Sequence, residues 1–106
     1  MMQAFDACNY KDESGSPGGG YVKATGLDIS WQAGPLGRGE DRKEPNGAFV
    51  ETVIAAALQR IEYYQMTKFA CIENERVCEN LKDAIRWLRS RTQDREKRGV
   101  EGTHQT

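Results

Sequence analysis

The most constraining feature of this sequence is a change in hydrophobic rhythm at Ala48. From there to about Met66, apolar residues recur at steps of three and four, the spacing that lines one face of an α-helix. The rhythm breaks over residues 67–72 and resumes over 73–98, before Gly99, a residue type that commonly follows a last helical turn. Two long helices with a short connection pack antiparallel, so we predict a helical hairpin.

Each predicted helix carries one apolar stripe. The stripe of the first helix is Val50, Val53, Ile54, Ala57, Leu58, Ile61 and Tyr64. The stripe of the second helix is Val77, Leu81, Ala84, Ile85 and Leu88. Asn46 is a candidate N-cap for the first helix, and Glu51 suits its first turns. A lone pair of helices buries little, so we expect strands or another subunit to cover the rest of both stripes.

The part before the hairpin predicts strands and loops. Residues 11–20 are polar and end in three glycines, which favours a flexible loop between extended pieces. Residues 21–24 and 27–31 are two predicted short strands, and apolar and polar residues alternate in the second. Residues 33–47 hold two prolines and four glycines and are predicted to form a loop.

A chain of 106 residues fits one domain. We divide this predicted single domain, 1–106, into strands and loops (1–47), the hairpin (48–98) and a tail (99–106). The hydrophobic fraction is 38% and the mean hydropathy is −0.75, so the core is modest. Self-assembly is therefore expected, and the fold class we predict is an oligomeric α+β protein.

Charge and cysteine content exclude several classes of function. The net charge of −1 does not favour binding to a nucleic acid polymer or to an anionic membrane. Six basic residues between Arg86 and Arg98 leave room for a local anion site. The longest apolar run, 53–58, is too short to cross a bilayer, and no signal peptide is visible. Three unpaired cysteines and one histidine, His104, predict free thiols in a reducing cytoplasm, with neither a metal site nor a cofactor.

Polar residues continue the stripe of the second helix at both ends. Asn74 precedes Val77 by one step, and Arg91 and Arg95 follow Leu88. Burying such groups without partners is costly, so these positions are candidate ligand-binding residues. The alternative is that the stripe simply runs out, since arginines in a last turn also suit the helix dipole.

Helix geometry separates these candidates into two groups. Asn74 and Arg91 are about 25 Å apart along a helix, too far for one small ligand to reach within one chain. Tyr64 should lie beside Asn74 across the connection. A shared pocket must then lie between two protomers and would combine an aromatic face, an amide and two guanidiniums, which suits a nucleotide-derived anion. Thr103 in the tail is a further candidate donor to a phosphate, although a frayed terminus is the plainer interpretation.

A rival interpretation rests on an acidic row, Glu75, Glu79 and Asp83, at four-residue steps. All-helical nucleotide pyrophosphatases hold magnesium with carboxylates arranged on helices, so hydrolysis is one alternative. The first helix supplies only Glu51 and Glu62, eleven residues apart, and Lys82 and Arg86 flank the row. A solvated, salt-bridged face explains the row better, and we predict no catalytic residue. A helical adaptor that blocks a host protein is another alternative.

Four segments together resemble the first type of phage Thoeris anti-defence sponge, a family that shares its hairpin domain with the second anti-CBASS protein family. The segments are LDISWQAGPLGRG (27–39), EPNGAFVETVIAAALQRIEYYQ (44–65), FACIEN (69–74) and RWLRSRTQDREKRGVEGTH (86–104). No single short motif is diagnostic, and the ordered set carries the resemblance.

The resemblance implies a protein that binds cyclic ADP-ribose isomers or cyclic oligonucleotides without cleaving them, in the cytoplasm of the infected bacterial host. It also implies a small antiparallel sheet before two long helices, in dimers that can form hexamers as trimers of dimers. By position, the family's ligand-binding aromatic, asparagine and arginines fall on Tyr64, Asn74, Arg91 and Arg95.

Overall fold

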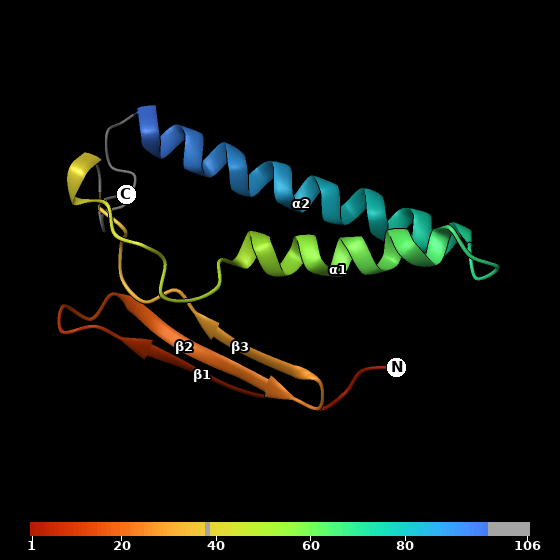
Figure 1. The fold of residues 1–106 in the computed structure, drawn as a ribbon, viewed down its shortest axis with the longest axis horizontal. Coiled ribbons are helices and arrows are strands. Elements are labelled where there is room, and N and C mark those ends of the chain that lie inside the picture. Colours follow the sequence, from red (N-terminus) through yellow and green to blue (C-terminus); the bar gives the residue numbers. More distant parts are fainter. Residues whose placement is uncertain (38, 98–106) are drawn as a thin grey trace. The chain divides into compact units, whose positions relative to one another are not determined.

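The structure, a computed structural model, describes residues 1–37 and 39–97, with side chains through residue 95. The described chain divides into two compact units, Met1–Phe49 and a second unit that begins at Val50. Figure 1 shows the first as a three-stranded sheet and the second as a pair of helices. The predicted α+β order, a small antiparallel sheet followed by an antiparallel helical hairpin, is confirmed.

The sheet has the order β1-β2-β3, with both neighbouring pairs antiparallel. Its strands are β1 (Asp6–Lys11), β2 (Pro17–Ala24) and β3 (Leu27–Trp31). The two strands expected over 21–24 and 27–31 are therefore present, but β2 begins four residues earlier, and β1 is an extended piece before the loop for which no bounds were predicted.

The prediction of a loop over residues 11–20 is wrong for its second half, because Pro17–Gly20 belong to β2. The chain reverses within residues 12–16, where the Asp12 carboxylate accepts hydrogen bonds from the backbone N–H groups of Ser14 (2.9 Å) and Ser16 (3.0 Å). Gly15 supports this turn with a φ of +84°. Asp, Ser and Gly are typical of a tight turn, and here the turn connects two paired strands directly.

The glycines of β2 have a packing role. A Cβ on Gly20 would lie 2.4 Å from the carbonyl oxygen of Cys8 in β1. The two backbones can approach this closely because position 20 has no side chain. The glycine run, which by sequence pattern alone indicates a flexible loop, is required in the sheet for the pairing of β1 with β2.

The sheet has one apolar and one polar face, because side chains alternate along each strand. The apolar face carries Ala7, Val22, Ala24, Leu27, Ile29 and Trp31, which share a face by register. On the other face the rings of Tyr10 and Tyr21 lie 6.2 Å apart, and the Lys23 ammonium lies 5.5 Å from the Tyr21 ring centre. The pKa of Tyr21 is raised, chiefly by the negative charge of Asp6 and then by desolvation.

The loop after β3 returns to the sheet edge. Ala48 forms a parallel bridge with Trp31; its N–H donates to Ser30 (2.7 Å) and its carbonyl accepts from Gln32 (2.9 Å). The expected N-cap role of Asn46 is wrong, since its amide instead bonds both the N–H (2.8 Å) and the carbonyl (3.1 Å) of Ala33. Asn46 therefore fastens the loop, and a side chain engaged there cannot cap a helix that begins four residues later.

The second unit consists of α1 (Val50–Gln65) and α2 (Ile72–Lys97). Both helices begin and end within two residues of their predicted bounds wherever the chain is described. Glu51 lies in the first turn of α1, as expected. Figure 1 shows the two helices running alongside each other in opposite directions.

Half-buried and buried side chains of the two helices alternate at steps of three and four, which is the pattern of a coiled-coil seam. On α1 this seam is formed by Glu51, Ile54, Leu58, Ile61 and Gln65, with Val53 and Tyr64 half-buried beside it. On α2 the seam is formed by Asn74, Cys78, Leu81, Ile85, Leu88, Thr92 and Arg95, with Ala84 half-buried beside it. Leu81, Ala84, Ile85 and Leu88 of the predicted α2 stripe are half-buried, but Val77 at its start and Arg91 beyond its end are exposed, and the neighbouring Cys78 and Thr92 lie in the seam instead.

The connection between the helices is held mainly by hydrogen bonds of the Gln65 side chain. The Gln65 amide donates to the carbonyl of Cys71 (3.1 Å) and accepts from its N–H (3.0 Å). The Thr67 hydroxyl donates to the Tyr64 carbonyl (2.6 Å), which satisfies a group that the end of α1 leaves open. These bonds fix how α2 begins relative to the end of α1.

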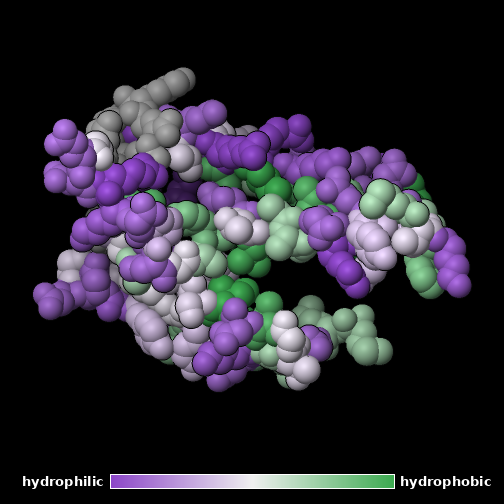
Figure 2. Space-filling view, in the orientation of Figure 1, coloured by the Kyte–Doolittle hydropathy of each residue, from purple (hydrophilic) through white to green (hydrophobic). Residues whose placement is uncertain are grey.

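Little apolar surface is buried. Cys78, at 9% exposed, is the most buried apolar side chain among the described residues. Trp87 is 76% exposed. Met66, Phe69 and Ile72 are exposed around the connection, and Figure 2 shows apolar residues at the surface there, beside hydrophilic ones. Within the described residues, no helix combines the length and apolar character that a membrane crossing requires.

Candidate functional site

Tyr64 lies in the last turns of α1 and is half-buried. The Arg60 Nε donates to its hydroxyl (3.2 Å), and the Arg60 guanidinium lies 5.1 Å from the Tyr64 ring centre and 5.3 Å from that of Tyr63. Arg60 was not among the candidate residues, although its spacing of four from Tyr64 was a usable signal. The arginine orients the tyrosine and places a positive charge beside its ring.

Asn74 lies in the first turn of α2 and is half-buried. Its side-chain amide makes no hydrogen bond within residues 1–37 and 39–95. A half-buried amide carries two donors and one acceptor that otherwise meet water or a ligand. Asn74 can therefore read the hydrogen-bonding edge of a bound molecule.

Arg91 and Arg95 lie near the other end of α2. Arg91 is exposed and forms neither a hydrogen bond nor an ion pair with any described residue, whereas Arg95 is half-buried in the seam. Guanidinium groups one turn apart can hold phosphate oxygens from two sides. Thr103, the fifth candidate, lies outside the described residues.

The structure divides the four described candidates between opposite ends of the helical hairpin. Helix α2 is unbroken from Ile72 to Lys97, so Asn74 and Arg91 are separated by about 25 Å along its axis. Tyr64 near the end of α1 and Asn74 near the start of α2 flank the connection between the two helices. Helix α2 has 26 residues and α1 has 16, so within the hairpin the arginines lie past the first turn of α1.

The acidic row of α2 is a salt-bridged face, as predicted. Glu79 pairs with Arg76 at 3.0 Å, and Asp83 pairs with Arg86. Lys82 reaches across the hairpin to Glu62 at 3.7 Å. No group of three or more His, Cys, Asp and Glu side chains in the described part of the chain has the arrangement of a metal site.

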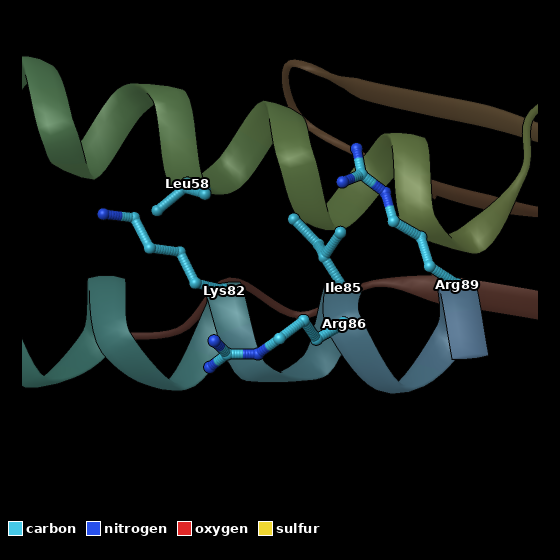
Figure 3. A pocket seen from close by; sticks show the side chains of 5 residues that line it. All are labelled: Leu58, Lys82, Ile85, Arg86 and Arg89. Carbon is cyan, nitrogen blue, oxygen red and sulfur yellow. The ribbon is translucent and has the colours of Figure 1, made fainter.

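The groove between the helices contains two adjacent hollows that share Lys82. One, of about 360 Å³, is lined by Glu62, Gln65, Met66, Glu75, Cys78 and Lys82. The other, of about 310 Å³, is lined by Leu58, Lys82, Ile85, Arg86 and Arg89 and is shown in Figure 3. The second hollow was not predicted as a site; its only sequence signal was three cations at steps of four and three.

Comparison with known proteins gives one informative match. No protein-family model matches the chain. It is 39% identical over 77 residues to a protein named "Thoeris anti-defense 1" from Bacillus phage SBSphiJ7. The match covers 73% of this chain and 51% of that protein, so the chain spans about half the length of the relative.

Proposed function

Because this chain belongs to the Thoeris anti-defence family, we propose that it is a non-catalytic sponge that sequesters cyclic nucleotide immune signals in the cytoplasm of an infected bacterium. The ligands in question are cyclic ADP-ribose isomers and cyclic oligonucleotides of Thoeris-type and CBASS-type defence. These molecules combine purine bases with phosphates, so a pocket for them needs a stacking surface, an edge-reading group and cations.

The observation that carries the proposal is the separation of these groups along the hairpin. Tyr64 and Asn74 lie at one end of the hairpin, and Arg91 and Arg95 at the other. A ligand touched by all four residues must then bind between two protomers, with the connection of one beside the end of α2 of the other. A two-fold axis would give each dimer two such pockets.

Each side chain has a chemical role in such a pocket. The Tyr64 ring, held by Arg60, stacks on a base, and the unbonded amide of Asn74 takes the base edge. Arg91 and Arg95 hold the phosphates, and Thr103 is a candidate for an additional hydroxyl donor to them. Sequestration needs only tight binding, and no nucleophile or metal is required by these roles.

Self-association is supported by the low burial within one chain. With Cys78 its most buried apolar side chain, the described chain leaves Trp87, Met66 and Phe69 largely in water. Burial of apolar area is worth about 25 cal/mol per Å², so covering these side chains with a second copy favours assembly. We propose a dimer as the minimal unit, with a hexamer formed as a trimer of dimers.

Hydrolysis of the signal is supported less well. Two of the three carboxylates of the acidic row, Glu79 and Asp83, are engaged by arginines. A magnesium-dependent pyrophosphatase would need those carboxylates for its metal.

The deciding experiment is calorimetric titration with a panel of cyclic ADP-ribose isomers and cyclic oligonucleotides, followed by heat release and analysis of the freed ligand. Recovery of intact ligand supports the sponge, whereas a hydrolysed product establishes an enzyme. Arg91→Ala should weaken binding by about 1.5–3 kcal/mol, the range for charge-assisted hydrogen bonds. Arg76→Ala, which removes an exposed arginine of the same helix, is the matched control and should bind normally.

The sharing of the pocket is tested by complementation. Asn74→Ala and Arg91→Ala proteins should each bind poorly, but mixing and re-annealing them gives heterodimers in which one pocket carries both defects and the other carries neither. Tight binding should return with a stoichiometry limited to the intact pockets. If mass spectrometry proves that heterodimers form and binding stays weak, the four residues do not meet across an interface.

A further inference from the structure

The hollow of about 310 Å³ in Figure 3 has an apolar floor and a basic rim. Leu58 of α1 and Ile85 of α2 form the floor, and both are half-buried. Lys82 and Arg89 extend from α2 toward α1 on either side of this floor, whereas Arg86 lies along α2. The volume is at the lower end of the range for ligand pockets, about 300–1,000 Å³, which fits a mononucleotide better than a lone ion.

The positive charge of this rim is only partly neutralised. Arg86 is paired with Asp83, and Lys82 is 3.7 Å from Glu62. Arg89 makes no hydrogen bond or ion pair with any described residue. Lys82 and Arg86 each have a carboxylate beside them, so an added anion is best placed beside the Arg89 guanidinium.

We propose that this hollow is a second ligand site, which binds a phosphate-bearing nucleotide of mononucleotide size. Arg89 is the main anchor for the phosphate, and Lys82 contributes a second charge when the ligand competes with Glu62 for it. The flat base or the ribose covers Leu58 and Ile85, where contact with the apolar floor replaces water.

The site is distinct from the composite pocket. Arg89 and Arg91 are two residues apart, so they leave the helix in directions about 200° apart. Arg89 belongs to the flank of α2 that borders the groove with α1, whereas Arg91 is on the opposite flank. The proposal therefore stands or falls separately from the function proposed above.

The test is calorimetric titration with AMP of a protein that carries Arg91→Ala, in which the composite pocket is disabled. In this background, Arg89→Gln should weaken AMP binding about tenfold, the lower end of what a charge-assisted hydrogen bond contributes. Glu62→Gln should strengthen AMP binding about two- to fivefold, because it releases Lys82 from a surface ion pair. Arg76→Gln is the matched control and should leave the affinity unchanged.

Two further probes examine the floor and the rim separately. Inorganic phosphate lacks the flat group and adenosine lacks the charge, so each should bind more weakly than AMP. Equal affinity for phosphate and AMP would remove the role of Leu58 and Ile85, and equal affinity for adenosine and AMP would remove the role of Arg89. Absence of AMP binding, or an unchanged affinity in both Arg89→Gln and Glu62→Gln, overturns the site.

Discussion

All eleven glycines of the chain lie outside residues 50–97, the described part of the hairpin. In the sheet unit, a Cβ on Gly20 or Gly47 would meet a carbonyl oxygen at 2.4 or 2.5 Å. The sheet unit is therefore shaped by how closely its backbones approach. The hairpin unit is shaped by a seam of side chains at steps of three and four. A backbone contact tolerates almost no change at a few positions, whereas a half-buried seam distributes its stability over many.

The difference bears on function, because the described candidate residues of both proposed sites lie on the hairpin. Helices hold their side chains at fixed spacing, so groups such as Arg89 and Arg91 can serve different surfaces of one element. The long side chains at these positions are exposed or half-buried and can change without loss of the fold. Fewer positions of the sheet unit can be substituted in this way, because its backbones lie close together at Gly20 and Gly47.

The contrast between the sheet unit and the hairpin unit would fail most directly if the sheet tolerated a side chain at position 20. Gly20→Ala should lower the free energy of unfolding by about 2–3 kcal/mol, because its Cβ must displace the Cys8 carbonyl. Gly18→Ala is the matched control in the same strand. Its Cβ would meet its nearest atoms at 3.5 Å, and we expect a change within about 0.5 kcal/mol. Urea unfolding measures both, and equal effects would contradict the backbone argument.

The hairpin has one position where a single side chain matters in a similar way. Gln65→Ala removes two hydrogen bonds to Cys71 and should cost about 1–2 kcal/mol, mostly by loosening the connection. Gln59→Ala, at an exposed position in the middle of α1, should cost less than about 0.5 kcal/mol. Hydrogen exchange of the Cys71 amide reports the same contrast locally. An exchange rate that Gln65→Ala leaves unchanged would show that the backbone alone closes the connection.

The smallest effect concerns the polar face of the sheet. The pKa of Tyr21 is raised mainly by Asp6, so Asp6→Asn should lower it toward the ordinary value of 10.0. The folded protein holds the phenolic proton of Tyr21 more tightly than the unfolded chain does. Protonated Tyr21 therefore contributes to the free energy of unfolding in full below pH 10.0, and this contribution is lost as pH rises through the higher folded pKa. Ultraviolet titration of the phenolate measures the shift. A Tyr21 pKa that Asp6→Asn does not change would place its cause elsewhere.

The sequence alone determined the hairpin, its bounds to within two residues, and the salt-bridged acidic face. These features depend on neighbours three or four residues away, which the sequence itself supplies. It also separated Asn74 from Arg91, since the distance follows from the rise of a continuous helix.

Only the tertiary structure decided which side chains are buried between the two helices and what role individual loop and strand residues have. The seam runs through Cys78 rather than Val77, because packing against α1 buries one of two adjacent side chains that the sequence alone does not distinguish. Asn46 binds Ala33 rather than capping α1, and Gly20 belongs to a strand. Lys82 and Arg89 line a hollow only together with Leu58 of the other helix. Each of these depends on a partner more than ten residues away or on packing across the hairpin, which local pattern does not contain.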